Sequence, residues 1–268
     1  MTDTRDTAGG LFRAGKLEAA IAAATADVRN HPTDLGSRIL LAELLLFAGN
    51  LERADVILDA ASRIDPTAAV AVAEFRQLLR AETARRQCRR EGRAPEFIGE
   101  PTPALRAVLA ALVALRAGDR DEAARRAGEA EASRPRAPGR VGDVPFDDFR
   151  DADDLGAGFF EMLTTTGKYF WIPTERVISI DFHAPYRPRD LAWRRGSVSV
   201  ADGPDGDVYI PAIYDTDESD ITEELRLGRN TDWVGPEDGL VLGRGQRVFL
   251  VGDEVRDIMD LTTLRFGQ

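Results

Sequence analysis

The sequence predicts an α+β protein, with helix-pair repeats in its N-terminal half and a C-terminal antiparallel sheet or partial barrel with a short helix. A spaced Gly/Ala/Pro pattern recurs in the first half, whereas the second half alternates short apolar runs with turn residues. Alanine falls from 32 of the first 145 residues to 6 of the last 123. Because alanine is the strongest helix former, its loss indicates a change from helical to strand-and-turn composition.

The N-terminal repeat consists of a glycine, an alanine five residues after it and a proline seventeen residues after it. The glycine ends one helix at a tight turn, the small alanine lets the next helix pack closely, and the proline ends that helix. The first two copies are 34 residues apart, and the third lies 69 residues beyond the second, about two periods. The three copies are Gly15/Ala20/Pro32, Gly49/Ala54/Pro66 and Gly118/Ala123/Pro135.

This period is typical of helix–turn–helix repeats. The residues resemble tetratricopeptide repeats in which Ala and Leu replace most of the aromatic positions. An additional helix fits between the second and third copies and ends at Gly92. We therefore expect helices over residues 35–48, 51–64, 68–91, 103–117 and 119–133.

The expected helix over residues 35–48 has more apolar residues than one buried face needs, since apolar spacings of three and four residues would form a single stripe. One face must pack inside the repeat. The surplus either contacts the rest of the protein, such as the C-terminal domain, or lines an exposed groove for a partner helix. The candidate partner-binding residues on this helix are Ile39, Glu43, Leu46 and Phe47.

Composition places a boundary near residues 134–146, where RPRAPG (residues 134–139) cannot continue a helix. The chain carries a net charge of −11, and residues 146–268 hold 13 Lys+Arg against 25 Asp+Glu. We expect two domains, a helical-repeat domain over 1–140 and an acidic α+β domain over 146–268. Because acidic surfaces repel phosphate groups, we expect neither nucleic-acid binding nor membrane insertion.

The start of the acidic half predicts a short helix over residues 151–166, where Asp151, Asp153 and Asp154 would cap the first free amides. A divalent-cation site is the alternative explanation of these carboxylates. Turn residues at 202–206 and 252–254 favour an antiparallel meander. The expected strands are residues 169–172, 176–182, 197–201, 207–213, 247–251 and 257–264.

Recognisable catalytic and metal-binding sets are missing from the sequence. A nucleophilic triad would have to use His183, and no serine or cysteine near it has the setting of a nucleophile. Cys88 is the single cysteine, so neither an internal disulfide nor a multi-thiolate zinc site is expected. We expect no catalytic residue, no metal site and no cofactor. The sequence shows no secretory signal and no apolar run of about 20 residues, so the expected location is the cytoplasm.

Five ordered segments together resemble the ImpE/TagJ family, accessory proteins of bacterial type VI secretion. The helix turn LFAG (residues 46–49) and the ERA that follows at residues 52–54 are also similar to the N-terminal half of that family, so the resemblance covers nearly the whole chain. The five segments are RDADD (150–154), YFWIP (169–173), RDLAW (189–193), LGRNTDW (227–233) and GQR (245–247).

The resemblance implies a non-enzymatic cytoplasmic adaptor that binds the small subunit of the contractile sheath, through the N-terminal helix of that subunit. It also implies a role in sheath assembly or turnover, with the AAA+ ATPase that disassembles the sheath as a further partner. The alternative function, from a different class, is a metal-dependent or phosphate-handling enzyme built on the acidic domain.

The Arg/Asp/Trp motifs of the acidic half have two interpretations. They form either a partly buried ion-pair network clamped by tryptophans or an exposed recognition patch, since Trp and Arg are enriched at interface hot spots. Exposure of the three tryptophans separates these interpretations. The candidate partner-binding residues in this half are Trp171, Trp193, Arg229, Asp232, Trp233 and Arg247.

Overall fold

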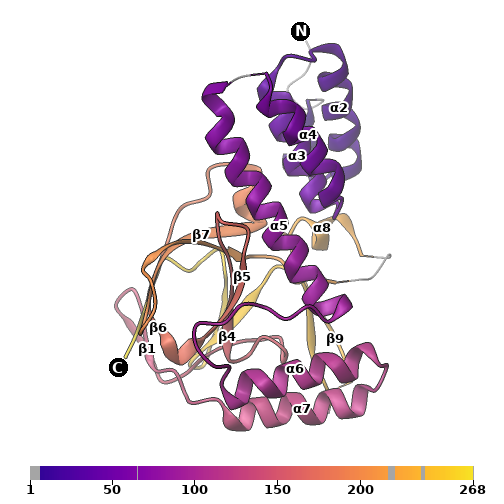
Figure 1. The fold of residues 1–268 in the computed structure, drawn as a ribbon. Helices are drawn as coiled ribbons and strands as arrows, with labels where there is room; N and C mark the ends of the chain where they lie inside the picture. The colour runs from indigo at the N-terminus through magenta and orange to yellow at the C-terminus, as the bar shows by residue number, and fades with distance from the viewer. Residues whose placement is uncertain (1–6, 65, 217–220, 237–238, 268) are drawn as a thin grey trace.

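The computed structural model describes residues 7–64, 66–216, 221–236 and 239–267. Its N-terminal half contains three helical hairpins and one long helix, α5, that runs from the α1–α4 bundle to the α6–α7 hairpin (Figure 1). The helices are α1 (Ala8–Arg13), α2 (Leu17–Asn30), α3 (Leu35–Phe47), α4 (Leu51–Ser62), α5 (Ala69–Glu91), α6 (Pro103–Arg116) and α7 (Arg120–Ser133).

The repeat pattern has the structural basis that its residue types predict. Each repeat glycine, at 15, 49 and 118, ends the first helix of a hairpin with φ between +76° and +81°, a conformation that side chains with a Cβ rarely adopt. The paired alanines at 20, 54 and 123, each on the second helix of its hairpin, are fully buried. The expected helices over 35–48, 51–64, 68–91, 103–117 and 119–133 are therefore confirmed to within two residues at each end.

The C-terminal half is built on an eight-stranded antiparallel sheet with the strand order β2-β1-β13-β6-β7-β8-β4-β5, and the sheet is strongly curved (Figure 1). Two smaller sheets, β12-β11-β3 and β10-β9, complete it. The strands are β1 (Gly139–Val141), β2 (Val144–Phe146), β3 (Phe149–Asp151), β4 (Phe159–Leu163), β5 (Tyr169–Pro173), β6 (Val177–Phe182), β7 (Trp193–Val200), β8 (Gly206–Pro211), β9 (Thr231–Val234), β10 (Leu242–Gly245), β11 (Val248–Val251), β12 (Glu254–Asp257) and β13 (Thr263–Phe266).

Two sequence predictions for this half are wrong. Residues 151–166 form no helix. Asp151 and Asp153 are buried, and besides nearby backbone N–H groups they accept hydrogen bonds from Tyr214 and Gly243, which are distant in the sequence. The chain turns from β3 into β4, and the short helix of this half is α8 (Glu223–Arg226). The expected strand over 257–264 is divided, since β12 ends at Asp257 and β13 begins at Thr263.

The surplus apolar face of α3 packs against the C-terminal half. Leu46 and Phe47 are buried, and α3 contacts the 3-10 helix η3 (Pro188–Leu191) that leads into β7. A single hydrophobic core includes these α3 side chains together with Trp171 and Trp193 from the sheet. The division into domains 1–140 and 146–268 stays a prediction, although the last helix ends at Ser133 and the first strand begins at Gly139.

The segment between the helices and the sheet, residues 134–138, is hydrogen-bonded to Asp148. Arg134 donates hydrogen bonds to both carboxylate oxygens of Asp148, at 2.9 and 2.7 Å, and Asp148 also accepts the backbone N–H of Ala137. Burial alone would raise the pKa of Asp148, but these hydrogen bonds outweigh it and lower that pKa to about 2. The proline-containing connection is thus part of the packed structure.

Among the helices in the described parts of the chain, none combines the length and the apolar character that crossing a bilayer demands.

Candidate functional site

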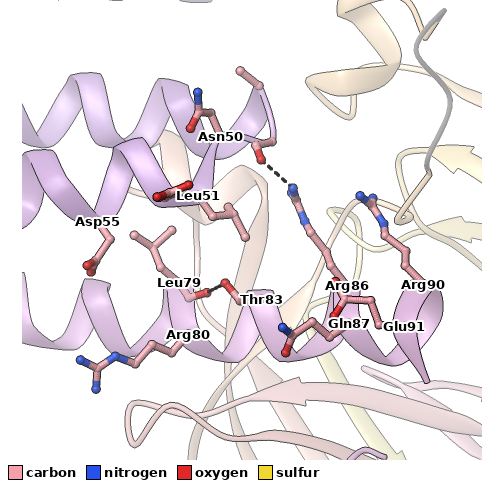
Figure 2. A pocket seen from close by; sticks show the side chains of 13 residues that line it. Asn50, Leu51, Asp55, Leu79, Arg80, Thr83, Arg86, Gln87, Arg90 and Glu91 are labelled. Atoms are coloured by element: carbon pink, nitrogen blue, oxygen red, sulfur yellow. Dashed lines mark hydrogen bonds between the residues drawn. The ribbon is translucent and has the colours of Figure 1, made fainter. Parts of the chain in front are cut away.

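A groove of about 700 Å³ lies between α5 and the turn that joins α3 to α4 (Figure 2). One face of α5 forms its floor, with Leu79, Thr83 and Arg86 following each other at helical spacing. The opposite wall is the turn at Ala48–Asn50 and the first turn of α4, including Leu51. Figure 2 shows Arg86 reaching across to this turn, where its Nη1 donates to the carbonyl oxygen of Gly49 at 2.9 Å.

Charges of both signs line the groove. Arg80, Arg86 and Arg90 project from α5, whereas Glu52 and Asp55 come from α4. Arg76 binds Asp55 through two hydrogen bonds of 2.7 and 2.9 Å, and the hydrogen bond from Arg76 is the main cause of the lowered pKa of Asp55. The groove therefore offers a mixed apolar and charged surface, as protein-binding surfaces do.

A second cavity of about 240 Å³ continues the groove toward the C-terminal half. It shares Gly49, Arg86 and Arg90 with the groove and adds Phe47 and the segment Ile213–Thr216. Arg90 binds Asp215 at 2.6 Å on this side. A ligand lying along α5 would thus contact both halves of the chain.

The opposite side of α5 is joined to the sheet by a buried network of charged residues around Glu161. Arg85 of α5 donates to both oxygens of Glu161, at 3.0 and 3.3 Å, while Arg247 donates to one of them. The hydroxyl of Tyr169 donates to Glu161 at 2.5 Å. Burial alone would raise the pKa of Glu161, but Arg85 and Arg247 outweigh it and hold that pKa well below its usual range.

Glu82 connects this network to the groove. Its Oε1 accepts hydrogen bonds from Arg85 at 3.3 Å and from Arg86 at 3.1 Å, and its Oε2 accepts from the indole nitrogen of Trp193 at 3.1 Å. Arg85 faces the sheet and Arg86 faces the groove, so one buried carboxylate binds both arginines. The floor of the groove is thereby fixed to the C-terminal half.

The conspicuous acid cluster is also part of the interior. Asp151 accepts a hydrogen bond from the hydroxyl group of Tyr214 at 2.6 Å and lies 3.5 Å from Arg247. Asp153 accepts the backbone N–H groups of Leu155 at 2.8 Å and of Gly243 at 2.9 Å. Burial raises the pKa of both carboxyls, against the opposing effect of the nearby arginines. Within the described residues, no group of three or more His, Cys, Asp or Glu could hold a metal ion.

The predicted partner-binding residues are not brought together in one surface. Phe47 borders the second cavity, but most of the others are buried and serve internal contacts. Trp233 is 41% exposed and lies on the β9–β10 hairpin, where Asp232 is 3.8 Å from Arg244. The buried members are Glu43, Leu46, Phe47, Trp171, Trp193 and Arg247, and Ile39 is half-buried.

Arg229 links the two halves. Its guanidinium donates to the carbonyl oxygens of Phe12 at 2.5 Å and Arg13 at 3.1 Å, at the end of α1. Of the network expected from the sequence, Asp151 and Arg247 take part together with the clamping residues Trp171 and Trp193. These residues form the buried network and not an exposed recognition patch. Trp233 is the one tryptophan at the surface.

Sequence reasoning missed Glu82, Arg85 and Glu161. The sequence does contain a signal for two of them, because Glu82 and Arg85 are charged residues on a helix face whose other buried residues are apolar. They are three residues apart on the face of α5 that carries Leu78. Glu161 lies between Phe160 and Met162 in a strand that is buried on both faces. Charged residues in such positions require partners, and sequence alone does not identify them.

The fold and the groove define a helical-repeat protein of the tetratricopeptide type in which antiparallel sheets follow the repeats. The tetratricopeptide repeat family model matches residues 11–79. The ImpE protein family model matches residues 143–265. A curated relative, the type VI secretion system accessory component TagJ of Pseudomonas aeruginosa, is 32% identical over 96% of this chain and 89% of its own length. The chain therefore belongs to the ImpE/TagJ family.

The fold agrees with that of a solved structure. The crystal structure of protein VPA1032 from Vibrio parahaemolyticus superimposes with a TM-score of 0.91 over 97% of both chains, at 25% sequence identity. The helical repeats and the curved sheet thus occur together in both proteins.

Proposed function

We propose that this protein is a non-enzymatic adaptor of type VI secretion that binds the small subunit of the contractile sheath and modulates sheath assembly or turnover. The observation that carries the proposal is the 32% identity to the type VI secretion accessory component TagJ over nearly the whole chain. The tetratricopeptide-like repeats support a protein–protein role, since such repeats present grooves to partner segments.

The groove between α5 and the turn that joins α3 to α4, called the α4–α5 groove from here on, is the proposed binding site for the N-terminal helix of the sheath subunit. Its apolar side chains are Leu79 on the floor and Leu51 on the opposite wall, and charges of both signs lie along its rims. An amphipathic helix places apolar side chains at every third or fourth position, with charged residues on either side. The occupant would lie along α5 and extend toward Asp215 in the second cavity.

Titration calorimetry of the full chain with a peptide copied from the N-terminal segment of the sheath small subunit of the same bacterium tests the proposal. Thr83 lies exposed on the groove floor, so Thr83→Tyr fills the groove without entering the core. We expect Thr83→Tyr to weaken binding at least about 10-fold, which corresponds to ~1.4 kcal/mol. The matched control is Val113→Tyr, at an exposed position of α6 outside the groove.

The outcomes separate the partner from the site. If neither the peptide nor the complete small subunit binds, the adaptor proposal fails. If the peptide binds and Thr83→Tyr binds as tightly as the unaltered protein, the partner is right and the groove is wrong. The same assay with the AAA+ ATPase that disassembles the sheath tests whether that enzyme is a further partner of the cytoplasmic complex.

A further inference from the structure

A separate cavity of about 220 Å³ lies among the end of α5, the α6–α7 hairpin and the β9–β10 hairpin. Its walls are partly apolar, with Leu112 and Leu115 from α6 and Leu242 from β10. Figure 1 shows that α6 and β9 are neighbours beneath the end of α5. Six charged residues also line the cavity, namely Arg89, Arg90, Arg120, Arg244, Asp153 and Asp215.

Arg89 is a half-buried cation of this cavity, and its guanidinium lacks an acceptor within the described parts of the chain. Its Nε is inaccessible and unpaired. No carboxylate oxygen of a described residue lies within 4 Å of its nitrogens, and the hydrogen bond from Arg116, at 3.3 Å, goes to the backbone carbonyl oxygen of Arg89 and not to its side chain. Burial alone would lower the pKa of Arg89, but Glu161 and Asp153 raise it, so the side chain stays charged. A buried guanidinium nitrogen without an acceptor is costly.

Both carboxylates of the cavity already accept hydrogen bonds from other groups of the protein. Both oxygens of Asp153 already accept backbone N–H groups, from Leu155 and Gly243. Asp215 binds Arg90 through both of its oxygens, at 2.6 and 3.3 Å. Because Asp215 pairs with Arg90, and Arg244 lies 3.8 Å from Asp232, the positive charge of the lining that no described carboxylate pairs with is that of Arg89 and Arg120. This local positive excess attracts anions.

We propose that this cavity binds a small amphiphilic anion, a carboxylate or a phosphate monoester with a short apolar chain, and that Arg89 anchors its anionic group. A guanidinium pairs with either head group through parallel N–H donors. The leucine wall takes the chain, and the volume is below the ~300–1,000 Å³ typical of drug-sized ligands, which limits the chain to a few carbons. The site is distinct from the α4–α5 groove, so it does not depend on the proposed adaptor role.

Thermal unfolding of the full chain at constant ionic strength tests this proposal with sodium acetate, butanoate, hexanoate, inorganic phosphate and butyl phosphate, against sodium chloride. A ligand that binds only the folded state raises Tm with concentration. We expect Tm to rise by at least about 2 °C with the best-fitting anion and to increase with chain length until the cavity is filled. Comparison of the carboxylate and phosphate series identifies the preferred head group.

Two variants and a control locate the binding. Arg89→Gln should weaken the calorimetric affinity for the best anion at least about 10-fold, as expected for a charge-assisted pair. If Arg89→Gln fails to fold, the same measurement on Arg120→Gln, at the exposed edge of the cavity, tests the proposal instead. The affinity for the anion should then fall by about 3-fold. Arg125→Gln is the control, because Arg125 lies on the exposed face of α7 and binds Glu122.

Three results would overturn the proposal. The first is an unaltered protein that no anion stabilises beyond chloride. The second is an affinity that stays the same when Arg89, or Arg120 in its place, is replaced. The third is equal weakening by Arg125→Gln with no dependence on chain length, which indicates ion binding at the general surface.

Discussion

Glu43 on α3 is a buried carboxyl whose ionisation opposes folding, and its replacement gives a quantitative test of the structure. The side chain is 3% exposed, and its Oε1 accepts no hydrogen bond from the described residues. Burial raises the pKa of Glu43 to about 7, although Arg189 and Arg187 oppose the shift and Asp190 adds to it. We expect Glu43→Gln to stabilise the protein, because glutamine resembles the protonated acid.

The sign and size of the effect follow from the two pKa values. Between the unfolded pKa near 4.5 and the folded pKa near 7, the folded state holds the proton that the unfolded state has lost, so stability falls as pH rises. One pKa unit is 1.36 kcal/mol, so the gain from Glu43→Gln should be about 1 kcal/mol at pH 5 and about 3 kcal/mol at pH 8.

Thermal unfolding at pH 5 and pH 8 measures this difference. For a chain of this size, the increment of about 2 kcal/mol corresponds to a Tm gain that is roughly 4–8 °C larger at pH 8. Glu100→Gln, at an exposed position after α5, is the control and should show no such dependence. An equal Tm change at both pH values, or destabilisation by Glu43→Gln at pH 8, would refute the assignment of Glu43 as a strained buried acid.

Two further predictions concern packing and the charged network. Ala54→Leu should lower stability by ~1–3 kcal/mol, because Ala54 on α4 is fully buried and the added methylenes would overpack its surroundings. Ala22→Leu, at an exposed position of α2, should not, as urea titration of both variants would show. Glu161→Gln should cost about 3–5 kcal/mol because it removes the carboxylate that buried Arg85 and Arg247 share, leaving them only the longer carboxylate contacts to Glu82 and Asp151. The exposed pair of Asp181 and Arg265 supplies the control, Asp181→Asn, and similar Tm changes in both variants would contradict the buried network.

The elements that sequence predicted well are those set by local chemistry. A glycine with positive φ, a small alanine and a terminating proline define each helical hairpin within 20 residues, so the pattern could be read directly. The strands around the turn at residues 202–206 were also recognisable, because turn residues and alternating apolar residues are local signals.

The failures have one physical cause, which is dependence on distant partners. Three nearby acids with an apolar segment after them are a good helix start, yet Asp153 is bound to Gly243, 90 residues away. In the same way, the apolar excess of α3 is consistent with an exposed groove until η3 and β7 are placed against it. No periodicity within α3 distinguishes a domain contact from a free surface.

The groove and the sheet cannot be separated for functional experiments, and α5 is the reason. Glu82 binds both Arg86 at the groove and Trp193 in the sheet, while Arg85, between them, binds Glu161. A fragment ending near residue 145 would lose Glu161 and Trp193, leave charges on α5 without their partners and expose the apolar end of α3. Loss of binding by such a fragment would therefore report on its folding rather than on the location of the partner site. Point substitutions at exposed groove positions of the complete chain change the surface alone, so they are the experiments that can assign the function of the groove.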